Sequence, residues 1–401
     1  MKIVMALDYY RPNVSGLSVY AERLARGLAA RDHAVTVVTH RHAPASAAEE
    51  TDAGVRVVRA PVTMRVGKAL FSAALPGIVA RELQGADVLH LHSPLVPAVP
   101  LARLARRTGA PLVVTYHCDL RLPPGLLGGL LEGGARISQN YALRRAAVIV
   151  HSTRDYAETV PAIASRIDRF VEIAPPPPSP SPGNGAGAAA LRQRWGIRSA
   201  PVILFAGRFA AEKGLPDLLR AFATVKGRFP EAVLVLAGEK DRVPGESVGR
   251  ELARLADDRG SGVLMPGLVA PEDMDGLFDL ADVLALPSTN STESFGMVQM
   301  EAMLRGVPAV ASDIPGVRQP VLRTGMGELA RPNDPASLSA ALLSVLESPA
   351  RYRGKAPAAQ AWFSLERTIG EYEDVYRRAA GAGAGTAASD PIRYNEMSSR
   401  S

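Results

Sequence analysis

Cysteine is nearly absent from this chain of 401 residues, which contains only Cys118. A single cysteine excludes an internal disulfide and suits a reducing compartment. The chain also lacks an uncharged apolar run of the about 18–20 residues that a membrane span requires. Its first residues, MKIVMALDYY, carry an early aspartate and lack the apolar core of a signal peptide. These absences predict a cytoplasmic protein.

Acidic residues are scarce in the first half of the chain relative to basic ones. Residues 1–174 contain 21 Lys and Arg but 14 Asp and Glu, whereas the remainder contains 25 and 26. A basic half could meet an anionic membrane surface or a phosphorylated lipid, which would place the protein peripherally on the inner face of the membrane. A GC-rich genome that favours arginine explains the excess equally well. No nucleic-acid partner is expected.

Short β-branched runs alternate with helical stretches along most of the chain. This alternation predicts an α/β fold of doubly wound parallel sheets. The runs are KIVMAL, AVTVVTH, VRVVRAP, DVLHLH, PLVVTYH and AVIVHS in the first half, then PVILFAGR, AVLVLAGE, VLMPG, VLALPS and PAVASD. Between the two sets, PPPPSPSPGNGAG reads as a linker, because prolines followed by glycines suit neither strand nor helix.

Two Rossmann-like domains are therefore expected, since 401 residues exceed what a single core usually holds. We place the N-terminal domain at 1–174, the linker at 175–190 and the C-terminal domain at 191–357. A helix at about 358–378 is expected to pack back on the N-terminal domain, and 379–401 is expected to be a disordered tail. Ligands of such sheets bind outside the carboxyl ends of the strands, so both domains can face an interdomain cleft.

The turn after the first strand, PNVSGLSVY, contains Ser15 and Gly16 just before a helix. A glycine here lets a phosphate approach the backbone and the helix N-terminus. The G-x-G-x-x-G fingerprint of dinucleotide-binding proteins is absent. A plain strand–helix turn explains these residues equally well.

Two cations follow the strand PVILFAGR of the second half. Gly207 and Arg208 end the strand, and Lys213 lies five residues further on, before Gly214. Arginine offers a bidentate fork and lysine a point charge, so both can converge on one diphosphate. The alternative is ordinary surface lysine and arginine.

Two carboxylates lie eight residues apart in ESFGMVQME. If the segment from Gly296 onward is helical, Glu293 precedes its N-terminus and Glu301 lies a little over one turn inside it. A helix N-terminus favours an anion, and carboxylates can accept hydrogen bonds from vicinal hydroxyls. The pattern therefore predicts a sugar–phosphate ligand, although a solvated glutamate is the commoner case.

Three histidines lie at the ends of predicted strands in the N-terminal half. His90 and His92 share a strand face, but a metal site would need a third ligand, and no such cluster is visible. His117 closes PLVVTYH, where it can enter the cleft or simply pack. We expect no metal, and we interpret Cys118 as a small buried residue.

Taken together, the motifs resemble those of a family 4 retaining glycosyltransferase with the GT-B fold, over most of residues 1–378. The resemblance rests on the order and spacing of five segments, SGLSVYAERLARGLAARDHAVTVVTH, TYHCDL, FAGRFAAEKG, LPSTNSTESFGMVQMEAMLRGVPAVASDIPGV and TGMGELARPNDPASL. It implies transfer of a hexose-type sugar from a nucleotide-diphosphate sugar to an acceptor, with retention and without a metal. The donor is a substrate, and no cofactor is implied.

The resemblance also implies roles for individual residues. Gly16 would let its loop contact the donor diphosphate, and Arg208 and Lys213 would neutralise that diphosphate as it leaves. Glu293 would hold the hydroxyls of the donor sugar, and Glu301 would bind the ribose hydroxyls.

The remaining implied contacts surround these groups. His117 matches the histidine on the acceptor side, close to the transferred sugar, where it would orient the substrate while the leaving phosphate takes the acceptor proton. The catalytic set is then His117, Arg208, Lys213 and Glu293. The other donor contacts fall on Gly207, Glu239, Gly267 and Leu268, and on the backbone N–H groups of Phe295, Gly296, Met297 and Val298.

The chain departs from the family pattern in two places. Ser15–Gly16 stands where many relatives have two glycines, and the polyproline run from Pro175 replaces an Asn-Gly-x-Asp turn. The acceptor is left open as a glycan, a lipid-linked or a small molecule. LRLPPGLLGGLLEGGARISQNYALRR could lie on a membrane or be a packed helix with a variable loop. Two alternatives stay open: an epimerase or phosphorylase of the same fold, and a non-catalytic nucleotide- or polyanion-binding protein.

Overall fold

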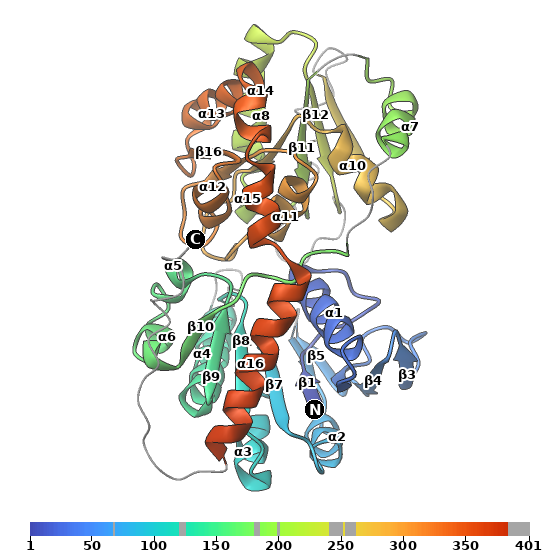
Figure 1. Cartoon of the computed structure of the whole chain (residues 1–401), viewed down its shortest axis with the longest axis vertical. Coiled ribbons are helices and arrows are strands. Elements are labelled where there is room, and N and C mark those ends of the chain that lie inside the picture. Colours follow the sequence, from blue (N-terminus) through green and yellow to red (C-terminus); the bar gives the residue numbers. More distant parts are fainter. Residues whose placement is uncertain are drawn as a thin grey trace.

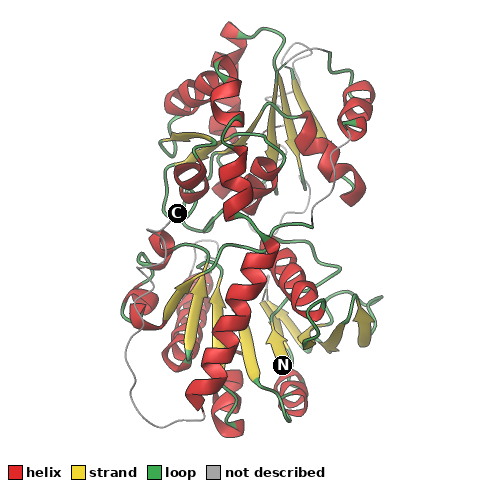
Figure 2. Cartoon of the chain, in the orientation of Figure 1, coloured by secondary structure: helices red, strands yellow, loops and turns green. Residues whose placement is uncertain are grey.

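The computed structural model describes residues 1–66, 69–119, 126–179, 185–198, 201–239, 252 and 262–383. Within these ranges the chain forms two large, mainly parallel sheets, one above the other in Figure 1, and each is built from one half of the sequence. Helices lie on both sides of each sheet (Figure 2). The predicted fold class, two Rossmann-like domains with doubly wound parallel sheets, is confirmed.

The first sheet has eight strands in the order β10-β9-β8-β7-β1-β2-β4-β3. Its strands are β1 (Lys2–Ala6), β2 (Ala34–His40), β3 (Glu49–Asp52), β4 (Val55–Ala60), β7 (Val88–Ser93), β8 (Leu112–Tyr116), β9 (Val148–His151) and β10 (Phe170–Glu172). The surrounding elements are α1 (Gly16–Ala29), a hairpin of β5 (Met64–Val66) and β6 (Ala69–Phe71), α2 (Leu75–Glu82), α3 (Ala98–Thr108), α4 (Leu126–Arg145), α5 (Arg154–Ala157), α6 (Pro161–Ala164) and η1 (Ile167–Arg169).

Alternation along β1 explains why helices cover both faces of this sheet. Ile3 and Met5 join the buried cluster that contains α1, whereas Val4 and Ala6 join the cluster that contains α2 and α3. Successive side chains of a strand point to opposite faces, so a strand that is apolar throughout must be covered twice. The edge strand β3 pairs antiparallel with β4, because Ala53 and Gly54 turn the chain directly back.

The second sheet has six parallel strands in the order β13-β12-β11-β14-β15-β16. They are β11 (Val202–Ala206), β12 (Val233–Ala237), β13 (Val263–Gly267), β14 (Val283–Leu286), β15 (Ala309–Ser312) and β16 (Gly327–Ala330). Their helices are α7 (Ala186–Arg194), η2 (Ala211–Lys213), α8 (Leu215–Arg228), η3 (Pro271–Asp273), α10 (Met274–Leu280), α11 (Met297–Leu304), α12 (Gln319–Thr324), α13 (Pro335–Glu347) and α14 (Pro349–Arg353).

The C-terminal segment forms two helices where the sequence predicted one at 358–378. α15 (Ala356–Trp362) packs on α11 and α12 of the second sheet, and α16 (Leu365–Gly383) packs on α1, β7 and β8 of the first. The single helix was wrong because Ser364 interrupts it and caps α16, its Oγ accepting from the N–H of Arg367 at 3.3 Å. The packing back on the N-terminal half is observed (Figure 1).

Two predicted boundaries also differ from the structure. Residues 186–190, placed in the linker, are the first turns of α7, whose alanines favour a helix and whose Gly187 lies against Gly276 of α10. Residues 379–383, placed in the disordered tail, continue α16, where Ala379 is buried. The rest of the predicted tail, 384–401, and the linker residues 180–184 lie outside the described residues.

No helix in the described ranges combines the length and the hydropathy needed to cross a bilayer.

Candidate active site

His117 lies at the carboxyl edge of the first sheet, directly after β8. Its N–H donates to the carbonyl of Ser93, at the end of β7, at 2.8 Å. Its Nε2 is 3.0 Å from Nδ1 of His92, the two rings stack at 5.2 Å, and the ring of Tyr20 meets it edge-on at 4.8 Å. Burial, helped by the nearby His92, holds the pKa of His117 well below its usual value. His117 is therefore a neutral, well-held imidazole at neutral pH.

The N-terminus of α1 reaches the same edge of the sheet, two strands away. Ser15 caps the helix, because its Oγ accepts from the N–H of Ser18 and its own N–H donates to Ser18 Oγ at 2.8 Å. A side chain at Gly16 would meet nothing within 4 Å. Packing therefore does not require this glycine, and the space beside it is open to a ligand that approaches the backbone.

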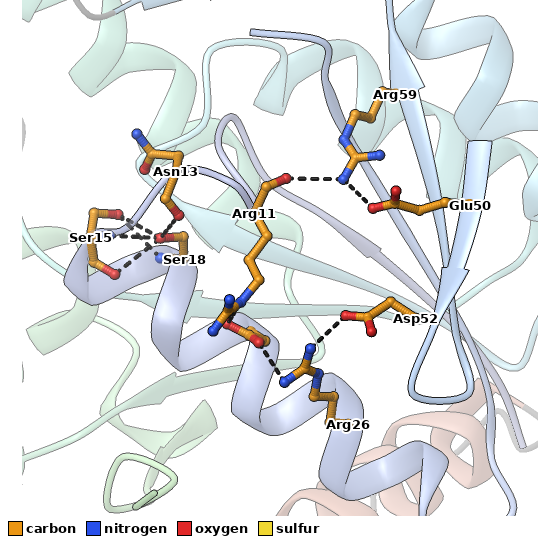
Figure 3. Close-up of polar contacts among 9 residues, drawn as sticks. Arg11, Asn13, Ser15, Ser18, Arg26, Glu50, Asp52 and Arg59 are labelled. Atoms are coloured by element: carbon orange, nitrogen blue, oxygen red, sulfur yellow. Dashed lines mark hydrogen bonds and ion pairs between the residues drawn. The ribbon is translucent and has the colours of Figure 1, made fainter. Parts of the chain in front are cut away.

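Ion pairs fix the loop that leads into α1 (Figure 3). The guanidinium of the buried Arg59 donates to the carbonyl of Arg11 at 3.0 Å and to Glu50 at 2.6 Å. Arg11 itself pairs with Glu22, the seventh residue of the helix. The open side of Gly16 is thus carried on a rigid turn.

On the other domain, the carboxyl end of β11 carries the two predicted cations. Arg208 follows the strand and its Nη2 lies 3.3 Å from Glu212 Oε1. Lys213 ends η2 and forms an ion pair with Glu293. A Cβ on Gly214, which has φ of +63°, would lie 2.1 Å from the carbonyl oxygen of Pro287. Only glycine fits there, so it fixes the turn that presents Lys213.

The helical pattern expected for ESFGMVQME is observed. α11 begins at Met297 with Gly296 as its N-cap, Glu293 precedes it, and Glu301 is its fifth residue. Gly296 has φ of +78°. The buried Gln299 braces the turn by donating to the carbonyls of Phe295 at 3.1 Å and Val317 at 3.0 Å.

This turn leaves the first backbone N–H groups of α11 without intrahelical acceptors, as at any helix start. Those of Met297 and Val298, directly after the N-cap Gly296, fall within the predicted stretch, whereas Phe295 precedes the cap. With Lys213 and Arg208 nearby in the same domain, the helix start offers positive potential to an anion.

Glu301 takes a partner that the sequence did not predict. Its Oε1 accepts from Nη2 of Arg23, a residue of α1 in the other domain, at 2.6 Å. Both side chains are about four-fifths buried, with exposed fractions of 18% and 21%. The pair therefore spans the two domains at the position where the resemblance places the ribose.

Further contacts show that the predicted site residues of the two domains face one another. The hydroxyl of Ser294 donates to the carbonyl of His117 across the domains. Burial raises the pKa of Cys118 to about 12, and the charges of Glu293, Lys213 and Arg208 all act on it. The structure thus brings together His117 and the three charged residues that the sequence predicted to be catalytic.

The predicted base contacts lie at the ends of two neighbouring strands. Gly267 ends β13, and its carbonyl accepts from the N–H of Gly238 beside Glu239 at 2.8 Å. Leu268 follows and exposes 73% of its surface. Gly207 joins this edge, because its N–H donates to Ala237 at 2.9 Å. The exposed apolar side chain of Leu268 suits the flat face of a base, and a carboxylate such as that of Glu239 suits its polar edge.

Sequence reasoning also missed further contacts between the two domains. Asp155 of α5 accepts two hydrogen bonds from Arg318, at 2.6 and 2.9 Å, and a third from the N–H of Gly316 at 2.9 Å. The hydroxyl of Tyr156 donates to the carbonyl of Ser291 at 2.8 Å. In the segment SDIPGVR, Gly316 is the one residue that could have suggested a close contact. Its φ of +81° brings its backbone close to Ser294.

The histidines weighed as metal ligands have other partners. Nε2 of His90 is 2.7 Å from Thr115 Oγ1, and its Nδ1 is 2.9 Å from the hydroxyl of Tyr376. His92 bonds to His117. Across the described ranges, no three or more His, Cys, Asp or Glu residues are grouped as a metal site would need.

Comparison with known proteins identifies the family. Residues 189–362 match the family described as glycosyl transferases group 1, and residues 15–176 match the glycosyl transferase 4-like domain. Phosphatidyl-myo-inositol mannosyltransferase of Mycobacterium tuberculosis (strain ATCC 25618 / H37Rv) is 30% identical over 96% of this chain and 98% of the relative. D-inositol 3-phosphate glycosyltransferase of Xylanimonas cellulosilytica is 31% identical over 92% of each chain.

Solved structures agree on the architecture. Sucrose-phosphate synthase from Thermosynechococcus elongatus has a TM-score of 0.74 at 19% identity, over 95% of this chain and 99% of its own. Anabaena Alr3699/HepE in complex with UDP-glucose has a TM-score of 0.71 at 20% identity, over 94% and 99%. The chain therefore belongs to the group 1, family 4-like glycosyltransferases and has their GT-B fold.

Proposed function

We propose that this glycosyltransferase moves a hexose from a nucleoside diphosphate hexose to a hydroxyl of its acceptor, with retention and without a metal ion. The observation that carries the proposal is the Lys213–Glu293 ion pair before the N-terminus of α11, opposite His117. The cations suit a diphosphate, and the carboxylate suits sugar hydroxyls. The solved relative in complex with UDP-glucose provides a precedent for such a donor on this fold.

The chemistry of the leaving group favours this arrangement. Breaking the bond between the sugar and the diphosphate develops negative charge on the phosphate oxygens. Arg208, Lys213 and the N–H groups at the start of α11 are fixed positive groups that stabilise such charge as it forms. These groups can supply by themselves the electrostatic stabilisation that a divalent ion supplies elsewhere.

Retention follows, in this proposal, from a front-face route. The acceptor hydroxyl attacks on the side from which the diphosphate departs, and a phosphate oxygen takes its proton. His117 does not act as the base, because burial keeps its pKa well below its usual value and it has a histidine partner. Its part is to orient the sugar from the acceptor domain.

The names of two relatives suggest the kind of acceptor. Both the mannosyltransferase and the inositol-phosphate enzyme act, by name, on inositol-bearing molecules. We propose a cyclitol hydroxyl, free or lipid-linked, as the acceptor to test before other glycans and small molecules.

Peripheral contact with a membrane is part of the same proposal. Exposed arginines gather on the neighbouring helices α3 and α4, where Ile137 also exposes 70% of its surface: Arg103, Arg106, Arg107, Arg136, Arg144 and Arg145. Such a surface suits anionic headgroups. Co-sedimentation with vesicles that contain anionic lipid, but not with neutral vesicles, is the expected result, and equal binding to both would contradict it.

The test is a donor screen with EDTA present. The protein is titrated calorimetrically with UDP, GDP, ADP, TDP and CMP, and the sugar conjugates of the preferred nucleotide are incubated with myo-inositol or phosphatidylinositol. One nucleotide should bind best, and its conjugate should give an α-linked product from an α-linked donor. A β-linked product, or a strict need for a divalent ion, would contradict the mechanism. Release of an epimerised free sugar without transfer would indicate an epimerase.

A further inference from the structure

Two buried histidines of the first domain form a pair whose proton positions follow from their surroundings. His92, in β7, is fully buried, and its Nδ1 is 3.0 Å from Nε2 of His117. Burial holds the pKa of each ring well below its usual value, and a neighbouring imidazole adds to the effect. A neutral imidazole has one N–H and one lone pair, so the contact permits only two tautomer combinations.

The second ring nitrogen of His92, Nε2, distinguishes the two tautomer combinations. Nε2 of His92 is shielded from water and meets no hydrogen-bond partner within the part of the chain that the structure describes. Leaving a buried N–H without an acceptor costs about 1–3 kcal/mol. Among backbone groups, orphaned buried N–H groups are rarer than under-satisfied acceptors, and we apply the same preference to the imidazole. Nε2 of His92 therefore holds the lone pair, and its Nδ1–H donates to Nε2 of His117.

This assignment fixes the proton of His117 on Nδ1. The ring itself is also fixed, by its stack on His92 at 15° and by the edge of Tyr20. Its carbonyl is held by Ser294 and by the buried ring of His151. Unlike His92, His117 is only half-buried. The Nδ1–H is therefore the polar group of this ring that remains for a ligand.

We propose that His92 is a positioning residue that keeps His117 in the Nδ1–H tautomer, so that His117 offers the sugar a hydrogen-bond donor. The tautomer follows from the contacts of the two rings alone, whereas its use in transfer rests on the proposed function. The groups that face His92 are the rings of His90 at 4.3 Å, His117 at 5.2 Å and Tyr20 at 6.2 Å. None of them supplies a carboxylate that would reverse the tautomer.

The direct test is nitrogen NMR of the full-length protein with ¹⁵N-labelled histidine. Two-bond couplings from the ring carbon protons distinguish protonated from unprotonated ring nitrogens, and His92→Asn and His117→Asn assign the signals. We expect Nδ1 protonated and Nε2 unprotonated in both rings at pH 7.5. An Nε2–H tautomer at His117 would overturn the proposal, whatever the activity.

Two variants that have the same shape as each other, His92→Asn and His92→Asp, test the consequence for transfer. The amide of His92→Asn can still donate from near the Nδ1 position, whereas the ionised carboxylate of His92→Asp can only accept and would draw the His117 proton to Nε2. We expect His92→Asn to keep the tautomer and most of kcat. His92→Asp should lower kcat by about tenfold to a hundredfold, the value of one lost donor, with a smaller change in donor KM.

The pH profile and a control separate positioning from loss of structure. His92→Asp should add an ionisation to the kcat profile, because a carboxylate raises the pKa of the adjacent imidazole. His33→Asn, at the opposite edge of the sheet and paired with Glu373, should change neither kcat nor the tautomer of His117. Equal kcat losses in His92→Asn and His92→Asp would show that the histidine is merely structural. If no nucleotide sugar is turned over, the proposed function fails while the NMR result still decides the tautomer.

Discussion

At the scale of single residues, the pairing of Lys213 with Glu293 decides what the donor site can hold. Each side chain exposes only 17% of its surface, so the pair is held by the site and not by chance on the surface. A diphosphate would attract Lys213, and sugar hydroxyls would donate to Glu293. Binding thus exchanges one ion pair for two sets of contacts with the ligand.

Glu293→Gln should separate transfer from nucleotide binding. The amide keeps the shape but accepts through one oxygen and carries no charge, so it holds the sugar poorly as positive charge develops at the anomeric carbon. We expect kcat to fall about 10²- to 10³-fold, as for loss of one preorganised group, while the affinity for the nucleotide changes little. Single-turnover kinetics and calorimetry measure the two quantities. Glu347→Gln, which alters only a surface pair with Arg228, is the matched control, and normal transfer by Glu293→Gln would refute the role.

The sequence located these residues better than it located their partners. Arg208 and His117 each follow an apolar strand and Gly267 ends one, and the carboxyl ends of parallel strands share one edge, so local pattern sufficed. Arg23 lies within a segment that carries the family resemblance, but the sequence predicted no role for it, and Asp155 lies on a short helix outside those segments. Their contacts with Glu301 and Arg318 depend on how two domains meet, which no local pattern encodes.

At the scale of elements, the start of α11 depends on one glycine. A Cβ on Gly296, with φ of +78°, would lie 2.3 Å from Cδ2 of Leu286 and 2.8 Å from Nε2 of Gln299. Gly306, just beyond the same helix, has φ of +76° but no atom within 4 Å of such a Cβ. The two positions have the same left-handed backbone conformation, but only at Gly296 would an added Cβ meet neighbouring atoms.

Gly296→Ala should therefore cost more than Gly306→Ala. Both lose about 1–2 kcal/mol from a left-handed conformation, and only Gly296→Ala must also move Leu286 and Gln299, which brace the N–H groups for the phosphate. We expect a lower urea midpoint for both and weaker nucleotide binding for Gly296→Ala alone. Denaturation curves and calorimetry measure this. Equal nucleotide affinity in the two variants would show that the helix start does not contact the ligand.

The bounds of helices and strands could be predicted where the composition of the sequence changes sharply. They could not be predicted where a single side chain determines where a helix begins or ends. The apolar runs KIVMAL and PVILFAGR, for example, were enough to predict β1 and β11. The break between α15 and α16 depends on Ser364 as a cap inside an otherwise helical pattern. The start of α7 depends on alanines outweighing Gly187, which is tolerated because α10 offers Gly276 at the contact.

At the scale of the whole molecule, the contact between Arg23 and Glu301 links domain position to nucleotide binding. If Glu301 receives both ribose hydroxyls, Arg23 competes with them for the carboxylate, because Arg23 already donates to Oε1. Other bridges, among them Asp155 with Arg318, Glu172 with Arg323 and Tyr156 with Ser291, do not involve the predicted donor residues. Nucleotide binding would then weaken the Arg23–Glu301 contact and leave these bridges in place.

Arg23→Ala should accordingly strengthen nucleotide binding. Removing a competing, partly buried ion pair is worth up to about 1 kcal/mol, or about fivefold in Kd. Arg26→Ala, one turn further along α1, removes pairs with Asp52 at 2.5 Å and with Glu22 at 2.7 Å, both in the same domain, and should leave the Kd unchanged. Calorimetric titration of both variants measures the effect. Weaker binding by Arg23→Ala would mean that Arg23 positions Glu301 for the ribose.

The stability of the whole protein should fall as the pH falls from 6.5 toward 4. Burial lowers the pKa of His90 to about 3 and of His151 to about 4, and it holds those of His92 and His117 well below the usual value. In this window the unfolded chain binds protons that the folded chain does not, so each histidine destabilises the fold by up to about 1.4 kcal/mol per pH unit. Asp8 opposes this, because burial raises its pKa to about 7 and the folded state binds the extra proton. Four histidines outweigh one aspartate, so urea midpoints should drop between pH 7 and 5.5.

The variant Asp8→Asn tests the opposing contribution of the aspartate. It should steepen the drop in urea midpoint and raise stability above pH 7, where the buried carboxylate is charged. A shallower pH dependence in Asp8→Asn would contradict the assignment.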